Sequence, residues 1–245
     1  MPRAKDSGLT VGQYRPSKPL QSRMKQAVER AIEQMNRTRF GIFVLLLIAA
    51  ASFFFWYQRD THTRARQFVI RSTLDRFSDP IVVLGDSIVE ASTLPRSLCG
   101  HAIINAGISG ASTTSDLGTM LEKSLGGKRA AMIVVSLGTN DAALSRSKQT
   151  FRTNYTALLK QISTLAPRSV VMAIPPVEDQ AAISTTINDF NSILPDIAKE
   201  AGATFAALPP MPGRHTFDGV HLNAAGYETW DKAILQEAAT ICDSK

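Results

Sequence analysis

The sequence is poor in cysteine, and most of its length carries no excess of charge. Two cysteines among 245 residues are too few for a disulfide-stabilised scaffold or for a zinc site with four thiolates. The net charge of +6 is confined to residues 1–39, which hold nine Lys or Arg against three Asp or Glu; the remaining 206 residues hold 18 of each. A neutral body argues against a nucleic-acid-binding protein. An apolar fraction of 44% and a charged fraction of 20% exclude wholesale disorder.

One long apolar run, FGIFVLLLIAAASFFFWY, occupies residues 40–57. Its 18 uncharged residues cover most of a hydrocarbon core of about 30 Å when helical, and aromatic residues close it, as is typical where lipid meets water. A buried core helix is disfavoured because the run is apolar on every face. A cleaved signal peptide is disfavoured because no small-residue cleavage site follows the run and 39 residues precede it. The sequence therefore predicts an uncleaved transmembrane helix.

Basic residues predict the orientation of this helix. Nine precede it and four follow it closely, so we expect residues 1–39 in the cytoplasm. The location would be the inner (cytoplasmic) membrane, crossed once, with the body periplasmic or extracellular. Residues 58–79 are polar and predict a linker with at most a helical turn, and residues 1–19 predict disorder.

An amphipathic pattern lies within the basic tail. Apolar residues recur there at three- and four-residue spacing, at Leu20, Met24, Val28, Ile32 and Met35. The pattern predicts a helix, and two environments for it remain open: the anionic inner leaflet, or water beside the membrane.

From residue 80 onward, short β-branched runs alternate with helix-like segments. The runs occupy residues 81–84, 102–104, 131–136, 169–174 and 204–208, and the expected helices occupy 113–124, 150–165, 184–200 and 224–241. Continuous apolar runs are typical of parallel strands that are covered on both faces. We therefore expect one α/β domain over residues 80–245, a doubly wound, flavodoxin-like, three-layer α/β/α fold with five parallel strands in the order 2-1-3-4-5.

Polar residues follow the predicted strands, at the sheet edge where such folds bind ligands. Ser87 follows the first strand, Gly107 the second and Asn140 the third, while Asp218 and His221 precede the last helix. A serine hydroxyl needs a base such as histidine, and the imidazole needs a carboxylate to fix its tautomer. The N–H groups of Ser87 and Gly107 and the side-chain amide of Asn140 would stabilise an oxyanion. A nucleophile, a base, a carboxylate and oxyanion donors are together the groups that ester hydrolysis requires.

Four sequence blocks resemble those of the SGNH (GDSL-type) hydrolases. They are GDSI at 85–88, NAG at 105–107, GTND at 138–141 and DGVHLN at 218–223. The resemblance spans about residues 80–242 and implies Ser87 as nucleophile, Gly107 and Asn140 in the oxyanion hole, and Asp218 with His221 as the remaining catalytic pair. It also implies that no metal or organic cofactor is needed. Asp86 and Asp141 are expected to brace loops, and His215 lacks the block that marks the base.

The resulting hypothesis is a serine esterase that hydrolyses an acyl ester, with an O-acetyl group on a cell-envelope carbohydrate as the expected substrate. Acyl transfer to a sugar hydroxyl, or lysophospholipid or thioester hydrolysis, would use the same residues. A non-catalytic glycan-binding scaffold is the alternative of another class. Expected partners are a small-molecule or glycan ester and the membrane, but no nucleic acid; the oligomeric state stays open.

The two cysteines raise a separate hypothesis. Cys99 follows the first helical region and Cys242 ends the last helix, and in a doubly wound fold these regions can be neighbours. In an oxidising compartment they would form a disulfide; the alternative is two free thiols.

Overall fold

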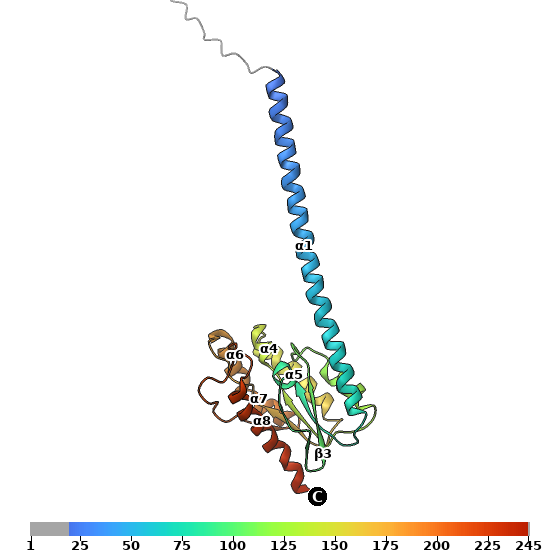
Figure 1. Ribbon diagram of the computed structural model, residues 1–245. Coiled ribbons are helices and arrows are strands. Elements are labelled where there is room, and N and C mark those ends of the chain that lie inside the picture. The colour runs from blue at the N-terminus through green and yellow to red at the C-terminus, as the bar shows by residue number, and fades with distance from the viewer. Residues whose placement is uncertain (1–19, 245) are drawn as a thin grey trace, which may run out of the picture. The chain divides into compact units, whose positions relative to one another are not determined.

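The computed structural model describes residues 20–244 (Figure 1). The chain divides after Arg59 into two compact units, 1–59 and 60–245. The disorder expected for residues 1–19 lies outside the described residues.

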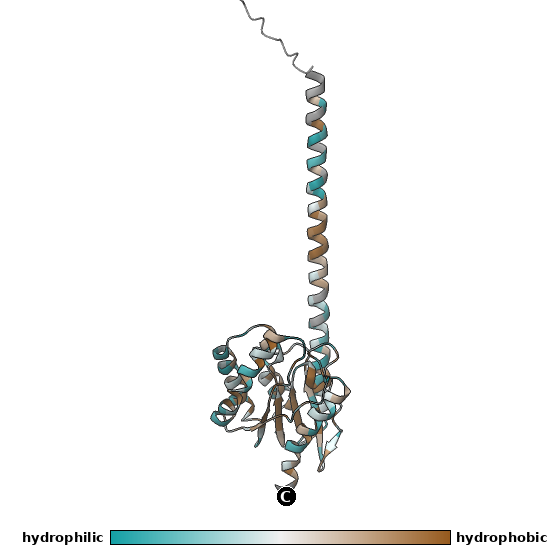
Figure 2. Ribbon diagram, turned by 90° about the vertical axis from the view of Figure 1, so that its left-hand side faces the viewer, coloured by the Kyte–Doolittle hydropathy of each residue, from teal (hydrophilic) through white to brown (hydrophobic). Residues whose placement is uncertain are grey.

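One helix, α1 (Leu20–Leu74), contains the basic tail's amphipathic segment and the whole apolar run. Figure 2 shows the apolar run as a band of hydrophobic turns with hydrophilic turns on the N-terminal side. The most apolar window has a mean hydropathy of 2.3, and none of it is buried against the protein. By length and composition, therefore, α1 is able to cross a membrane, and its apolar window is not part of the hydrophobic core.

The linker expected over residues 58–79 with at most a helical turn is not what the structure shows, because α1 continues to Leu74. Its last part packs on the body, where Ile70 and Leu74 are 1% and 0% exposed. Lys128 Nζ then donates to the carbonyls of Leu74 and Asp75, at 2.9 and 2.8 Å, and so satisfies groups that the end of a helix leaves unpaired. Two buried apolar residues in a polar stretch were too weak a pattern to predict this helix.

The sheet has the predicted parallel order with one additional edge strand. Its order is β2-β3-β1-β4-β5-β6, and every pairing is parallel except that of β2 with β3. The strands are β1 (Ile81–Gly85), β2 (Ser97–Leu98), β3 (His101–Gly107), β4 (Met132–Ser136), β5 (Ser169–Met172) and β6 (Thr204–Ala206). The five parallel strands thus confirm the order 2-1-3-4-5 in the numbering of the sequence analysis.

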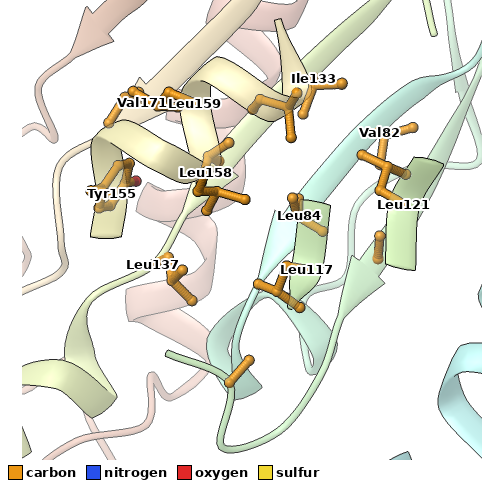
Figure 3. Packing of buried hydrophobic residues seen from close by; sticks show 14 of the residues in the cluster. Val82, Leu84, Leu117, Leu121, Ile133, Leu137, Tyr155, Leu158, Leu159 and Val171 are labelled. Carbon is orange, nitrogen blue, oxygen red and sulfur yellow. The ribbon is translucent and has the colours of Figure 1, made fainter. Parts of the chain in front are cut away.

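Helices cover both faces of the sheet, which confirms the three-layer fold. Successive side chains of a strand point to opposite faces, so Val82 and Leu84 join one core cluster while Ile81 and Val83 join the other. The first cluster includes the end of α1 with α3 (Leu117–Leu125), α5 (Lys148–Ile162), α6 (Ala181–Asn191) and α7 (Leu194–Glu200). The second includes α2 (Ser87–Glu90), α8 (Ala224–Ala238) and the 3₁₀ helix η1 (Ala239–Ser244). Figure 3 shows Leu117 and Leu121 of α3 packed near Leu84 and Val82 of β1.

One predicted helix is divided in the structure, and one short helix was not predicted. The helix expected over 184–200 is two helices, α6 and α7, separated at Ser192 and Ile193; Pro195 lies in the first turn of α7, where its missing N–H costs nothing. The short helix α4 (Thr139–Ala143), which carries Asn140, was not predicted.

A disulfide joins Cys99 to Cys242, with the two Cα atoms 5.6 Å apart. Cys99 and Gly100 form the positive-φ turn between β2 and β3, and Cys242 lies in η1. The bridge closes a separation of 143 residues and ties the edge of the sheet to the C-terminal end of the chain.

We predict that replacing both cysteines by serine lowers the free energy of unfolding by about 2–5 kcal/mol, because the cross-link restricts the unfolded chain. Urea titration of the full chain in maltoside detergent, with and without reductant, would measure this. Equal midpoints for the parent in both conditions, or two free thiols by non-reducing mass spectrometry, would contradict the prediction.

Candidate active site

The site forms where the carboxyl ends of the central strands meet. Gly85, the last residue of β1, lies in register with Gly107 of β3 and Ser136 of β4. Asp86 follows and caps α2, since its Oδ1 accepts the N–H of Ile88 at 2.9 Å. Ser87 is therefore the first residue of α2, held at the edge of the sheet by the strand before it and the cap beside it.

Three of the predicted residues form a hydrogen-bonded chain. Ser87 Oγ is 3.0 Å from His221 Nε2, and His221 Nδ1 is 2.7 Å from Asp218 Oδ2. Asp218 Oδ1 accepts the N–H groups of His221 and Val220 at 2.7 and 3.0 Å. The hydrogen bond from the His221 ring, followed by the one from its backbone, lowers the pKa of Asp218 to about 2. Asp218 is thus ionised at neutral pH and able to stabilise a charged imidazole.

The loop that carries this pair is held at both ends. Asn223 Oδ1 accepts the N–H of Gly226 and so begins α8, while its N–H donates to His215 O at 2.9 Å. Phe217 N–H donates to His221 O at 3.0 Å, which closes a tight turn around Asp218. These backbone bonds fix the relative positions of the carboxylate and the imidazole.

Glu178, from the segment after β5, braces the same loop. Its Oε2 accepts the N–H of Thr216 at 2.8 Å and the Thr216 hydroxyl, and its own N–H donates to Gly219 O at 2.8 Å. The hydroxyl bond is the largest cause of the lowered pKa of Glu178. Gly219 has a φ of +90°, and a Cβ there would lie 2.7 Å from Glu178 O, so only glycine fits this turn.

A pocket of about 520 Å³ opens over Ser87 and His221. Its lining residues are Ser87, Glu90, Ala91, Ser109, Phe217, Asp218, His221 and Tyr227. Phe217 is 68% exposed and stacks on the imidazole of His221, with ring centroids 5.7 Å apart. Tyr227 OH donates to Ile88 O at 3.0 Å, which ties α8 to α2. The pocket thus combines the hydroxyl and the base with an exposed aromatic face.

Asn140 lies at the start of α4, the helix that follows β4, and is not among the residues that line this pocket. Its Nδ2 donates one hydrogen to Ala111 O at 2.8 Å, which orients the amide and leaves the second hydrogen for a ligand. The next residue, Asp141, is buried and accepts the N–H and hydroxyl of Thr113 at 2.9 and 2.6 Å, with Arg146 Nε 3.4 Å away. Asp141 therefore braces the 111–114 loop, as expected from the sequence.

Gly107 lies at the end of β3 with its polar backbone atoms already bonded. Its N–H donates to Asn105 Oδ1 at 3.0 Å, and its carbonyl accepts from Arg66 Nε at 2.8 Å. A Cβ at this position would overlap the backbone of Glu90, so glycine is required for the approach of β3 to α2. The structure thus gives Gly107 a packing role that the sequence analysis did not consider.

His215 lies apart from the hydrogen-bonded chain. It is 8% exposed, and its ring lies 3.1 Å from Gly213 O, 3.3 Å from Pro176 O and 3.5 Å from Glu178 Oε1. Over the part of the chain that the structure describes, no group of three or more His, Cys, Asp or Glu side chains is arranged to hold a metal ion.

Asp86, the residue directly before Ser87, is an acidic side chain that is almost fully buried, with an exposed fraction of 2%. Burial raises its pKa to about 7, against the smaller opposing effects of the Ile88 N–H and the charge of His221. Folding therefore favours the protonated form of Asp86. The stability that this preference contributes is fully present below pH 3.8, the ordinary pKa, and is lost as the pH rises through about 7.

One comparison with known proteins shows the family. The model of the GDSL-like Lipase/Acylhydrolase family matches residues 83–229. No curated protein matches the sequence significantly.

Solved structures with the same fold include a "putative platelet activating factor" from Streptococcus pneumoniae, with a TM-score of 0.65 and 23% identity, covering 77% of this chain and 98% of that one. A lipolytic protein of the G-D-S-L family from Veillonella parvula has a TM-score of 0.55 and 18% identity, with coverages of 64% and 96%. A catalytic mutant of an acetylxylan esterase from Geobacillus stearothermophilus has a TM-score of 0.53 and 17% identity, with coverages of 66% and 94%.

We predict that Asp86→Asn removes a pH dependence of stability. Asn keeps an acceptor for the Ile88 N–H but has no charge to bury, so the parent should lose of the order of 3 kcal/mol of unfolding free energy between pH 4.5 and 8 relative to the variant. Urea titrations at both pH values would measure it. Asp75→Asn, at a side chain that is 87% exposed, is the matched control. Parallel pH dependence in parent and Asp86→Asn would contradict the assignment.

We also predict that Gly107→Ala destabilises the body by about 1–3 kcal/mol, because the added methyl group forces β3 and α2 apart. Gly41→Ala is the control, since its Cβ would meet no atom within 4 Å. Thermal unfolding of both variants in detergent would compare them. A Gly107→Ala chain as stable as the parent would refute the packing role.

Proposed function

Because this chain belongs to the GDSL-like lipase/acylhydrolase family, and is thus an ester-bond hydrolase, we propose that it is a serine esterase. The observation that carries the proposal is the continuous chain of hydrogen bonds, 3.0 Å from Ser87 Oγ to His221 Nε2 and 2.7 Å from His221 Nδ1 to Asp218 Oδ2. Nucleophile, base and orienting carboxylate are each within reach of the next.

In this mechanism Ser87 Oγ attacks the acyl carbonyl carbon while its proton passes to His221 Nε2. Asp218 stays ionised, because its pKa is held at about 2, and it stabilises the imidazolium through Nδ1. The imidazolium returns the proton to the leaving alcohol as the tetrahedral intermediate collapses to an acyl-enzyme. Water, deprotonated by His221, then releases the acid and restores Ser87.

The oxyanion of the intermediate needs preorganised donors. We assign two of them to the backbone N–H of Ser87 and the second Nδ2 hydrogen of Asn140. The third donor that the family resemblance implies is the Gly107 N–H, which in this structure donates to Asn105 Oδ1 at 3.0 Å.

A small acyl group on a carbohydrate is the substrate we favour. The pocket is open, and the exposed ring of Phe217 offers the flat apolar face on which a sugar ring stacks. The acetylxylan esterase among the solved structures supports this choice only as an analogy of fold. Acyl transfer to a sugar hydroxyl would use the same residues and is separated from hydrolysis by the test below.

We further propose that the enzyme is a single-pass protein of the inner membrane, with its N-terminus cytoplasmic and its body in the periplasm or outside the cell. The exposed apolar turns of α1 support an anchor, and the excess of basic residues before them supports the orientation. The Cys99–Cys242 disulfide supports an oxidising compartment for the body.

We predict that the full chain in maltoside detergent hydrolyses p-nitrophenyl acetate, and that Ser87→Ala lowers kcat by roughly 10⁴-fold or more, because the nucleophile is lost. Ser163→Ala, at an exposed serine on the far end of α5, is the control. Butyrate and octanoate esters would report the preferred chain length.

Equal turnover by parent and Ser87→Ala would refute the nucleophile. A folded parent that is inactive on every ester, but that moves acetyl groups onto a labelled sugar acceptor, would replace hydrolysis by transfer.

A further inference from the structure

The end of α1, residues 60–74, is joined to the surroundings of the active site through Arg66, which bonds to β3, and through His62, which pairs with Glu90. We propose that Arg66 is a positioning residue, which holds β3 and the turn that carries Ser87 in the geometry needed for attack. The inference rests on the proposed function for its effect on rate. It adds to the catalytic domain a helix segment that precedes the family match at residue 83.

The segment faces the body with every fourth residue. His62, Arg66, Ile70 and Leu74 follow one another at four-residue spacing, which places them on one side of a helix. Ile70 and Leu74 are in the core, and only 20% of the Arg66 side chain is exposed. By contrast Arg64, on another face, is 77% exposed and is paired with Asp60 of its own helix.

Arg66 takes the place of a neighbouring strand at the edge of the sheet. Beyond β3, the short strand β2 pairs only with His101 and Ala102, so the later carbonyls on that edge have no strand beside them. The guanidinium fills this place: it donates to Gly107 O at 2.8 Å and to Asn105 O at 2.9 Å. It also donates to Asn105 Oδ1 at 2.7 Å. Three bonds from two nitrogens of one guanidinium suit the fork of an arginine, and a lysine cannot reproduce them.

Asn105 transmits this position to the nucleophile. Its Oδ1 accepts from both Arg66 and the Gly107 N–H, so the orientation of the amide is fixed. Its Nδ2 then donates to Val89 O at 2.6 Å and to Glu90 O at 3.2 Å, both in α2. Since α2 begins at Ser87, a shift of the Asn105 amide displaces the turn that aims the hydroxyl at His221.

Glu90 forms a second connection, from α1 to the wall of the pocket. Its Oε1 lies 3.1 Å from His62 Nε2 and 3.9 Å from Arg66 Nε. Its Oε2 accepts the N–H and the hydroxyl of Ser109, at 2.6 and 2.8 Å. Glu90 and Ser109 both line the pocket over Ser87. The positive charge of Arg66 therefore lies close to a carboxylate in the pocket wall and compensates its negative charge.

The test compares Arg66→Ala and Arg66→Lys with Arg64→Ala as the matched control, all in the full chain in maltoside detergent. For p-nitrophenyl acetate we expect Arg66→Ala to lower kcat roughly 10–100-fold while KM changes less than about threefold, because misplacement of the nucleophile affects the chemical step more than binding. Arg66→Lys should recover only a minor part of the rate. Millimolar guanidinium should raise kcat of Arg66→Ala at least about twofold, and Arg64→Ala should match the parent.

Hydrogen exchange gives a readout that needs no activity. In Arg66→Ala, and also in Arg66→Lys should the alanine variant not fold, amides of residues 87–92 and 105–110 should exchange at least about tenfold faster, while those of residues 132–136 in β4 stay unchanged. If the parent is inactive on all esters, the proposed function is refuted but the positioning role of Arg66 is not. The exchange data then decide whether Arg66 positions residues 87–92 and 105–110.

Three results would overturn the inference. One is a parent-like kcat together with parent-like exchange in Arg66→Ala. Another is faster exchange spread evenly over β4 and the other strands, which would mean that Arg66 serves global stability only. The third is a loss confined to KM, which would place Arg66 in substrate binding instead.

Discussion

The register of β1 against β3 and β4 is the constraint on which the rest of the site depends. Parallel pairing ends the three strands at one level, so that Gly85, Gly107 and Ser136 stand side by side. The segments that follow are therefore delivered to a single edge of the sheet, and Ser87 and Asn140 reach it from different strands. A slip of one residue would turn every side chain of a strand to the opposite face and separate these groups.

The second half of the site comes from the loop before α8. Asp218 and His221 are held by backbone bonds within the turn, and Glu178 and Asn223 fasten that turn to its surroundings. The loop meets the sheet-borne half at the hydrogen bond between Ser87 Oγ and His221 Nε2, across 134 residues of sequence. In the proposed mechanism this arrangement would supply the preorganisation that acyl transfer requires.

The end of α1 belongs to the same compact unit as the candidate active site. The compact unit begins at Asp60, and Arg66 bonds to the edge of β3 in place of a further strand. The helix that carries the apolar run therefore contributes to the hydrogen-bond network at the edge of β3. A membrane anchor built in this way would position the site as well as localise it.

The sequence by itself determined the enzyme family and the order of the strands. The GDSI, GTND and DGVHLN blocks indicated Ser87, Asn140, Asp218 and His221, because nucleophile, donor, carboxylate and base are recognisable from residue type and from their place after strands. Apolar runs likewise indicated the parallel sheet, since burial on both faces leaves a continuous pattern.

Only the tertiary structure decided the roles of Gly107, Asp86 and Arg66. Gly107 proved to be required for packing against Glu90, and burial is what raises the pKa of Asp86. Arg66 lies in a polar stretch, and its partners Asn105 and Gly107 are 39 and 41 residues away. Such properties depend on what surrounds a residue in space, and local sequence patterns report only what lies within a few residues along the chain.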